Sequence, residues 1–386
     1  MSIGTTVFMN CNKLKTTPSA NGEYLGNAKN PFLVLYRLIT KDISSFNISE
    51  DAKILYESAF DGCFELASIT IPNSVVWIGR YAFRQCDKLE KVVLPTGIIG
   101  LDMQAFSYCS ALTQVVFPDT LVSIGESAFE YCEKLQNITL PDSIKEIGKK
   151  AFANCKLLSS IRIPDEIFKI GDAAFDGCTA LSYNEYENGI YLGSQNNEHL
   201  ILMGLKSKTL PNQVIHKDTK FIDRGVFATT NIEEIEFPDG LLGIGGSAFR
   251  DCKKLRFISM PDSVIELGEY AFARCENLGS IFLSQNLKTI NNHAFIQCIN
   301  LRTVHIPRSV ICIGFEAFSS CTNLHLVQVP STVLTIKDTA FSNCPNLLIE
   351  TIKGTYAEEF ATNKGIPCTN NFFKYFEDHN KDLLHE

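Results

Sequence analysis

The sequence predicts a solenoid, a stack of similar coils in which each coil contacts its neighbours. An Ala-Phe pair recurs at a fixed spacing, a cysteine follows three residues after the phenylalanine, and a short alternating apolar stretch comes next. The alanines of a first series are 23 residues apart, at Ala59, Ala82, Ala105, Ala128, Ala151 and Ala174. A second series starts at Val226 and, after one step of 22 residues, continues at Ala248, Ala271, Ala294, Ala317 and Ala340. A period of this length is typical of solenoids.

Each part of a coil follows from its residue pattern, as the repeat over 128–152 illustrates. Its Ala, Phe and Cys share one side of a turn if that turn is a short α- or 3₁₀-helix, so we expect them to point inward. Ile138 and Leu140 then alternate with polar residues, which is the period of a β-strand. Pro141 has no N–H group to donate and ends the pairing of that strand. Gly148 is expected to supply a backbone conformation that other residues avoid.

The cysteines occupy one position of the repeat. Of the 14 cysteines, 11 lie at this position: Cys63, Cys86, Cys109, Cys132, Cys155, Cys178, Cys252, Cys275, Cys298, Cys321 and Cys344. Stacked coils place them about 4.8 Å apart, a distance that allows disulfides as well as free thiols. Thr230 replaces the cysteine in one repeat, which favours a buried, reduced and structural role. No Cys-x-x-Cys pair and no histidines at ligand spacing are present, so no zinc site is predicted.

The repeat motif resembles that of a known family. The stretch LASITIPNS (66–74) is close to the leucine-rich-repeat core, and the attached IGxxAFxxC pattern is similar to the BspA-type leucine-rich repeats. The resemblance covers nearly the whole chain. It implies a right-handed leucine-rich-repeat solenoid with a parallel β-sheet on the concave face and short helical or 3₁₀ turns and loops opposite. It also implies a surface or secreted protein, because some members are implicated in adhesion to host or matrix proteins.

A longer repeat divides the predicted solenoid. Residues 3–60 align with residues 170–227 without a gap, at an offset of 167. We therefore expect one continuous solenoid over 1–353 that consists of two tandem arrays, 1–169 and 170–353. Each array opens with a 29-residue coil whose extra residues form a β-hairpin, at about 21–38 and 188–205. Each hairpin is interpreted either as a spacer that caps or bends the stack or as a docking loop.

The two ends of the chain carry separate expectations. Ile3, Gly4 and Phe8 are already in repeat phase, which fits either a fragment of a longer array or an exposed first coil. No signal peptide is visible at the N-terminus, which leaves a cytoplasmic location open. Residues 354–386 are expected to form a C-terminal cap helix over 354–365 and a charged tail with aromatic anchors.

Several function classes lack support in the sequence. We find no signature of a serine hydrolase, zinc protease, phosphate-binding loop or carboxylate pair, so no enzyme activity, cofactor or metal is predicted. The net charge is −8 and the lysines and arginines are dispersed, which argues against nucleic acid as a partner. No apolar stretch is long enough to cross a bilayer.

The remaining candidate is the outward face of the predicted sheet. The third and fifth positions of LxxIxI point away from the core, and in the second array they include several apolar and aromatic residues. The predicted binding face consists of Phe257, Phe282, Arg302, His305, His325, Leu326 and Gln328. Exposed patches of this kind often mark interaction sites. We expect a non-enzymatic, adhesin-like module that binds a protein or glycan of a host or extracellular matrix; the alternative is a structural spacer or stalk without a ligand of its own.

Overall fold

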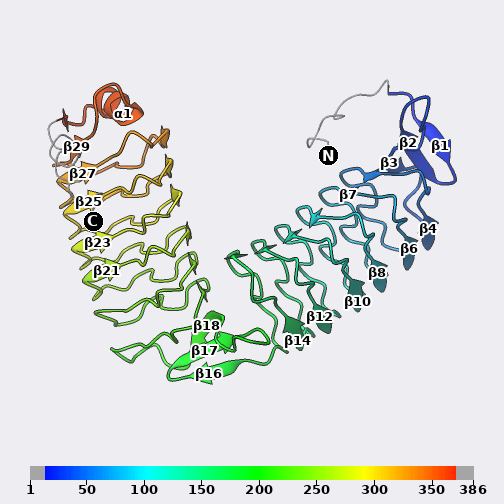
Figure 1. Cartoon of the computed structure of the whole chain (residues 1–386), viewed down its shortest axis with the longest axis horizontal. Coiled ribbons are helices and arrows are strands. Elements are labelled where there is room, and N and C mark those ends of the chain that lie inside the picture. Colours follow the sequence, from blue (N-terminus) through cyan, green and yellow to red (C-terminus); the bar gives the residue numbers. More distant parts are fainter. Residues whose placement is uncertain (1–13, 371–386) are drawn as a thin grey trace, which may run out of the picture. The chain divides into compact units, whose positions relative to one another are not determined.

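The computed structural model describes residues 14–370, so the predictions for Ile3, Gly4 and Phe8 and for the tail beyond Asn370 lie outside the described residues. The chain forms two compact units (Figure 1). The first comprises the described residues up to Ser182 together with Ser194–Asn196, and the second comprises Tyr183–Gly193 and the described residues from Asn197 onward. Each unit is a stack of coils. The predicted continuity of the solenoid and its division at 169/170 stay predictions.

Most coils of the first unit contribute one three-residue strand. These strands are β4 (Ser45–Asn47), β6 (Ser68–Thr70), β8 (Lys91–Val93), β10 (Gln114–Val116), β12 (Asn137–Thr139) and β14 (Ser160–Arg162). They pair in parallel as β4–β6, β8–β10 and β12–β14. In β8, β10 and β12 the central residue is buried and its two neighbours are exposed, which confirms the strand predicted from LxxIxI.

The second unit repeats this arrangement. Its three-residue strands are β21 (Phe257–Ser259), β23 (Ser280–Phe282), β25 (Thr303–His305), β27 (Leu326–Gln328) and β29 (Leu348–Glu350). β21 pairs with β23, while β25, β27 and β29 form a parallel sheet that ends with β30 (Cys368–Thr369). The parallel solenoid predicted from the repeat is therefore present in both units.

A second set of strands, each of two residues, runs along the opposite side of the coils. In the first unit these are β5 (Ile54–Leu55), β7 (Trp77–Ile78), β9 (Gly100–Leu101), β11 (Ser123–Ile124), β13 (Glu146–Ile147) and β15 (Lys169–Ile170). In the second they are β19 (Phe221–Ile222), β20 (Gly243–Ile244), β22 (Glu266–Leu267), β24 (Thr289–Ile290), β26 (Cys312–Ile313) and β28 (Thr335–Ile336). Their pairing is parallel and in repeat register. The sequence predicted no strand here and expected a special backbone conformation at Gly148. Gly148 has no left-handed φ; a Cβ atom there would instead lie 2.6 Å from the backbone nitrogen of Glu126 in the preceding coil.

The turn that carries Ala, Phe and Cys differs from the predicted helical or 3₁₀ turn. Ser127 and Tyr131 have φ angles of 53° and 63°, which interrupt a right-handed helix. Backbone N–H groups alternate between two kinds of acceptor: Ala128 donates within its own coil to Gly125, whereas Phe129 donates to Ala151 of the next coil at 2.8 Å. The turn therefore joins adjacent coils through hydrogen bonds, which an α-helix would have kept within itself.

Two ladders of buried side chains fill the interior of each stack. In the first unit the rings of Phe60, Phe83, Phe106, Phe129, Phe152 and Phe175 are stacked, with centroids 4.8–5.8 Å apart. The cysteines form the second ladder as free thiols. The thiol of Cys155 donates to the carbonyl of Phe129 in the preceding coil (3.2 Å), and this contact recurs along the stack. Burial raises the pKa of the Cys298 thiol to about 12.

Both long coils form antiparallel sheets that continue into the two-residue strands. In the first, β1 (Thr17–Ser19) pairs with β2 (Gly22–Leu25), and β2 pairs with β3 (Val34–Leu38). In the second, β16 (Asn184–Tyr186) pairs with β17 (Gly189–Leu192), and β17 pairs with β18 (Ile201–Leu205). β3 then pairs in parallel with β5, and β18 pairs in parallel with β19. Each long coil thus adds antiparallel strands to the edge of a parallel sheet.

The helix expected over 354–365 is present as α1 (Tyr356–Lys364). It begins at Thr355, whose side-chain oxygen accepts a hydrogen bond from the N–H of Glu358, and it ends at Gly365 with φ 66°. Phe360 is buried, and its ring contacts that of Phe341, the last of the stacked phenylalanines, with the centroids 6.2 Å apart. α1 therefore covers apolar surface at the end of the second unit's core.

Candidate functional site

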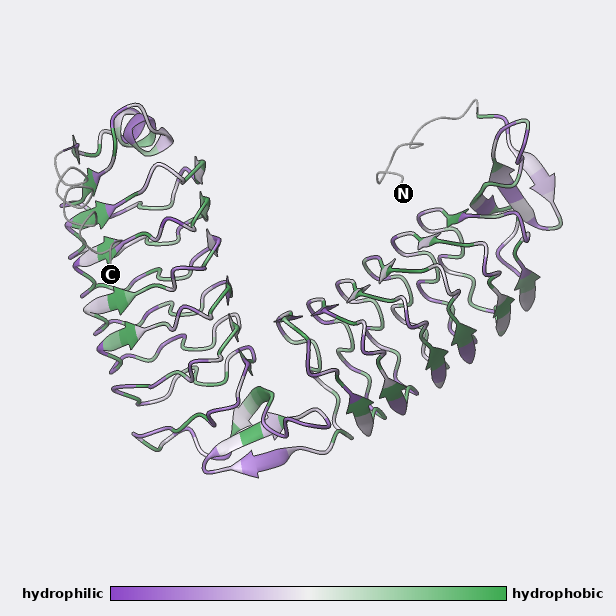
Figure 2. Cartoon of the chain, in the orientation of Figure 1, coloured by the Kyte–Doolittle hydropathy of each residue, from purple (hydrophilic) through white to green (hydrophobic). Residues whose placement is uncertain are grey.

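The predicted binding face lies on the outward side of the three-residue strands of the second unit. Register places Phe257 beside Ser280 and Ser259 beside Phe282, so the two phenylalanines are diagonal neighbours on β21 and β23. Figure 2 shows these strands as largely hydrophobic even though one side of each faces solvent. Phe257 and Phe282 lie on the exposed side of these strands, and the binding role of this face stays a prediction.

Phe257 and Phe282 form the aromatic centre of this face. Their ring centroids are 5.7 Å apart and their planes are inclined at 69°, an edge-to-face contact. The side chains nevertheless stay 42% and 59% exposed. Packing of one ring on the other therefore covers only part of each, and apolar ring surface remains available for a partner.

The polar members of the predicted face lie further along the stack. Gln328 is only 7% exposed, because it lies in a row in which its Oε1 contacts Nδ1 of His305 and its Nε2 donates to Oε2 of Glu350 (2.7 Å). Its amide is therefore occupied by these two neighbours, and its role is to orient His305. His305 is exposed at the end of this row.

Arg302, His325 and Leu326 lie at the start of their strands. The N–H of His325 donates to the carbonyl of Arg302 (3.0 Å), and both side chains are exposed, whereas Leu326 is half-buried. Within residues 14–370 the guanidinium of Arg302 has no carboxylate partner. This cation is therefore available to an external acceptor.

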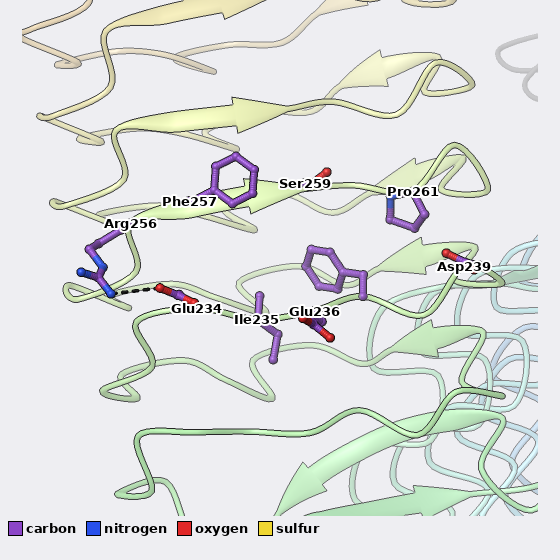
Figure 3. Close-up of a pocket in the computed structure, with 9 residues that line it drawn as sticks. Glu234, Ile235, Glu236, Asp239, Arg256, Phe257, Ser259 and Pro261 are labelled. Atoms are coloured by element: carbon purple, nitrogen blue, oxygen red, sulfur yellow. Dashed lines mark hydrogen bonds and ion pairs between the residues drawn. The ribbon is translucent and has the colours of Figure 1, made fainter.

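A pocket next to Phe257 escaped the sequence analysis. Figure 3 shows it between the coil that carries Glu234 and Glu236 and the following strand β21. Its volume is 590 Å³, and Ile235, Phe237, Phe257 and Pro261 supply apolar surface to its lining. The signal in the sequence was the pair of glutamates at the outward positions of LxxIxI, because none of the three-residue strands named above carries two carboxylates there.

The pocket is predominantly acidic. Glu234, Glu236 and Asp239 line it together with a single cationic side chain, Arg256. The Nη2 atom of Arg256 lies 3.0 Å from Oε1 of Glu234 and 3.1 Å from Oε2 of Glu233 (Figure 3 draws the first contact). This arginine is therefore held to one side by two carboxylates.

The structure gives no support for metal or membrane chemistry in the part of the chain that it describes. Residues 14–370 contain no group of three or more histidine, cysteine or carboxylate side chains that could hold a metal ion. His305 and His325 make separate contacts, the first with Gln328 and the second with the carbonyl of Asn323. Within the same residues, no helix has both the length and the apolarity that a bilayer span requires.

The fold and the repeat geometry define a leucine-rich-repeat protein. The chain belongs to the BspA type leucine rich repeat family, whose model matches residues 36–118, 101–217 and 220–348. Leucine-rich repeats generally mediate protein interactions, and BspA-like members are typically bacterial surface proteins. The family and the fold are typical of non-enzymatic proteins, and no enzyme family is indicated.

Solved structures with the same fold come from several bacteria. A leucine rich cell surface protein of Faecalibacterium prausnitzii is 24% identical, with a TM-score of 0.43 and coverage of 90% of this chain and 97% of that chain. A leucine-rich repeat protein of Bacteroides ovatus is 24% identical, with a TM-score of 0.41 and coverage of 92% and 97%. The pneumococcal vaccine antigen PcpA is 18% identical, with a TM-score of 0.34 and coverage of 87% and 82%. A comparison with curated proteins gives no significant match.

Proposed function

We propose that this chain is a non-enzymatic recognition module that binds a protein or glycan through the strand face of its second unit. The exposed edge-to-face pair of Phe257 and Phe282 carries the proposal, because water-facing aromatic rings are unfavourable unless a partner covers them. Arg302 and His325 add exposed polar groups at the border of the same face. A centre of aromatic residues with an arginine beside it is the usual composition of an interaction hot spot.

The family supports a location outside the cell, and we propose that the chain is an adhesin-like protein that is secreted or displayed on the cell surface. The ligand in this proposal is a component of a host cell or an extracellular matrix. Stacked coils suit this task because they present a broad, regular surface. Each coil of the stack needs only its neighbours for stability.

A structural spacer or stalk is the alternative function, and the first unit favours it. The outward positions of its strands include Ser68, Thr70, Asn137 and Thr139, all of them polar and without aromatic rings. A spacer needs no more than such a face. The two functions can coexist in one chain if the first unit supports the second.

The experiment that tests the proposal is a binding screen of the full chain with a matched surface control. The immobilised protein is screened against extracellular matrix proteins, cell-surface proteins and a glycan panel, beside the variants Phe257→Ala/Phe282→Ala and Arg302→Ala. The control is Val93→Ala/Val116→Ala, because these residues are 53% and 40% exposed on the strands of the first unit.

The proposal expects a ligand whose binding is lost in the double phenylalanine variant, weakened in the arginine variant and unchanged in the control. A ligand that the phenylalanine variant keeps, or the absence of any ligand, contradicts it. In the second case the spacer function gains support. If the double phenylalanine variant keeps the ligand and a variant altered in the hairpin over 188–205 loses it, the long coil is the docking element.

A further inference from the structure

The coil over 232–238 and strand β21 do not pair, and the same is true of β6 and β8, of β10 and β12, and of β23 and β25. Among residues 14–370, one backbone hydrogen bond joins these two segments, from the N–H of Arg256 to the carbonyl of Glu233 (3.1 Å). β21 pairs with β23 on its other side only. The backbone edge of β21 that faces the pocket is therefore open, as in an edge strand that can accept a further chain.

The separation also exposes core positions. Ile258 and Met260 hold the two inward positions of LxxIxI on β21 and are 0% and 5% exposed. The equivalent residues of the preceding coil, Ile235 and Phe237, are only half-buried and line the pocket. The pocket thus has an apolar floor of side chains whose equivalents on β21 are buried.

Two carboxylates of the rim are unpaired. Arg256 lies between Glu233 and Glu234, whereas Glu236 and Asp239 have no ion-pair partner within the described part of the chain. These two side chains are exposed and lie on the same coil as the apolar floor. Charge complementarity therefore requires a ligand with positive charge next to an apolar group.

The first array provides an internal comparison. Its equivalent coil carries Ser68, Thr70 and Asn73 where the second array has Glu234, Glu236 and Asp239. Ile69 is half-buried there, like Ile235. A gap between this coil and the next is therefore compatible with both arrays, whereas the negative charge beside the gap is present only in the second array.

We infer that this pocket binds an extended peptide segment through a lysine or arginine side chain, as the specific contact of the binding face proposed above. The aliphatic stem of such a side chain covers Ile235 and Phe237 while its charged end reaches Glu236 and Asp239. The backbone of the peptide pairs with the open edge of β21. The peptide side chain two residues from the lysine or arginine points the same way and contacts Phe257. The inference rests on the proposed recognition function and adds the chemical class of the ligand. The acidic rim disfavours nucleic acid and makes no use of a neutral glycan.

Fluorescence anisotropy with labelled peptides tests the inference. A short peptide that alternates lysine and valine is compared with versions that carry glutamine or glutamate in place of lysine. We expect the lysine peptide to bind, the glutamine version to bind about tenfold more weakly, and the glutamate version not to bind. The variant Glu236→Gln/Asp239→Asn is expected to lose about tenfold in affinity for the lysine peptide and most of its salt dependence.

The matched control is Asp119→Asn/Glu126→Gln, which removes two exposed carboxylates from the first unit and should leave binding unchanged. Circular dichroism of both variants verifies that they are folded. Equal affinity for the lysine and glutamine peptides, or full binding by the Glu236→Gln/Asp239→Asn variant, overturns the inference. So does complete displacement of the peptide by an equal concentration of spermine, which would indicate a site for simple cations.

This result is separable from the proposed function. If the Phe257→Ala/Phe282→Ala variant loses a partner found in the screen while Glu236→Gln/Asp239→Asn keeps it, the recognition face stands and the basic-peptide inference fails. If both variants keep every partner, the proposed function fails as well.

Discussion

Truncation of one stacked phenylalanine should destabilise the first unit strongly, and the structure shows why. Phe129 is 0% exposed and lies between Phe106 and Phe152, with ring centroids 5.5 Å and 5.4 Å away. Phe117 contacts the same ring edge-on at 5.8 Å. The change Phe129→Ala therefore removes an aromatic ring that three others surround.

The expected cost lies toward the upper end of the range for such changes. Replacement of a buried phenylalanine by alanine typically costs about 3–5 kcal/mol, and less when neighbouring atoms can fill the cavity. The N–H of Phe129 donates to Ala151 and its carbonyl accepts the thiol of Cys155, so hydrogen bonds fix the spacing between this coil and the next and limit collapse into the cavity. We therefore expect a loss of about 4 kcal/mol. With a urea slope of about 2 kcal/mol/M, the unfolding midpoint falls by about 2 M.

Urea titration, monitored by tryptophan fluorescence, measures this loss in the first unit, which contains Phe129. The chain has one tryptophan, Trp77, which packs against Leu25, Val34, Ile54 and Tyr56 in the first unit. The control is Phe64→Ala, because Phe64 is 52% exposed and its loss should change stability by less than about 0.5 kcal/mol. A midpoint that falls equally for both variants, or that barely moves for Phe129→Ala, would refute the account of the aromatic ladder as the core.

Three further predictions concern the thiols, one histidine and one glycine. A thiol alkylating reagent should modify exposed Cys368 in the native protein but spare Cys132, whose pKa burial raises; mass spectrometry of peptides reads this out. Burial and the positive charge of a neighbouring histidine lower the pKa of His216, so the unfolded chain binds a proton more readily than the native one. The melting temperature should therefore decrease as the pH is lowered from about 7.5 to about 5.5, and His216→Ser should make this decrease smaller. A Cβ atom at Gly148 would lie 2.6 Å from the backbone nitrogen of Glu126, so Gly148→Ala should cost about 1–3 kcal/mol in urea titration.

Each of these predictions has an outcome that contradicts it. Alkylation of Cys132 as fast as that of Cys368 would mean that the coils open readily, whereas urea-unfolded protein should react at both sites. An unchanged pH dependence in His216→Ser would assign the acid sensitivity to groups other than this histidine. For the glycine, the matched change is Gly240→Ala, where a Cβ atom meets nothing within 4 Å; equal losses at the two positions would exclude the steric explanation.

The sequence predicted those features that depend on side-chain periodicity. Alternation around Ile138 located the three-residue strands, and the short segment 354–365 was predicted as the helix that the structure shows as α1, because both signals are local. The two-residue strands were missed, since two residues such as Glu146 and Ile147 are too short to show a period. The turn at Ser127 was predicted as helical because the spacing of Ala, Phe and Cys fits a helix as well as it fits the observed series of turns.

The binding face was predictable in part for the same reason. Outward positions follow from the strand period, so Phe257 and Phe282 were found from the repeat alone. The contacts of Gln328 with His305 and Glu350 depend on neighbouring coils and left no signal in any one repeat. The pocket lies between two coils, and the gap that forms it cannot be read from the sequence of either coil alone.

The hydrogen bond from the thiol of Cys155 to the carbonyl of Phe129 spans 26 residues of chain, and the equivalent bonds of Cys132 and Cys178 span the same number. Every coil therefore finds its partner in the segment made immediately before it. At ordinary rates of translation one coil follows another from the ribosome within about one to five seconds. The thiols of each new coil meet carbonyl acceptors of the preceding coil, and its carbonyls meet N–H donors that are already present there. The stack can therefore form in the order of synthesis, and no coil has to wait for a distant part of the chain.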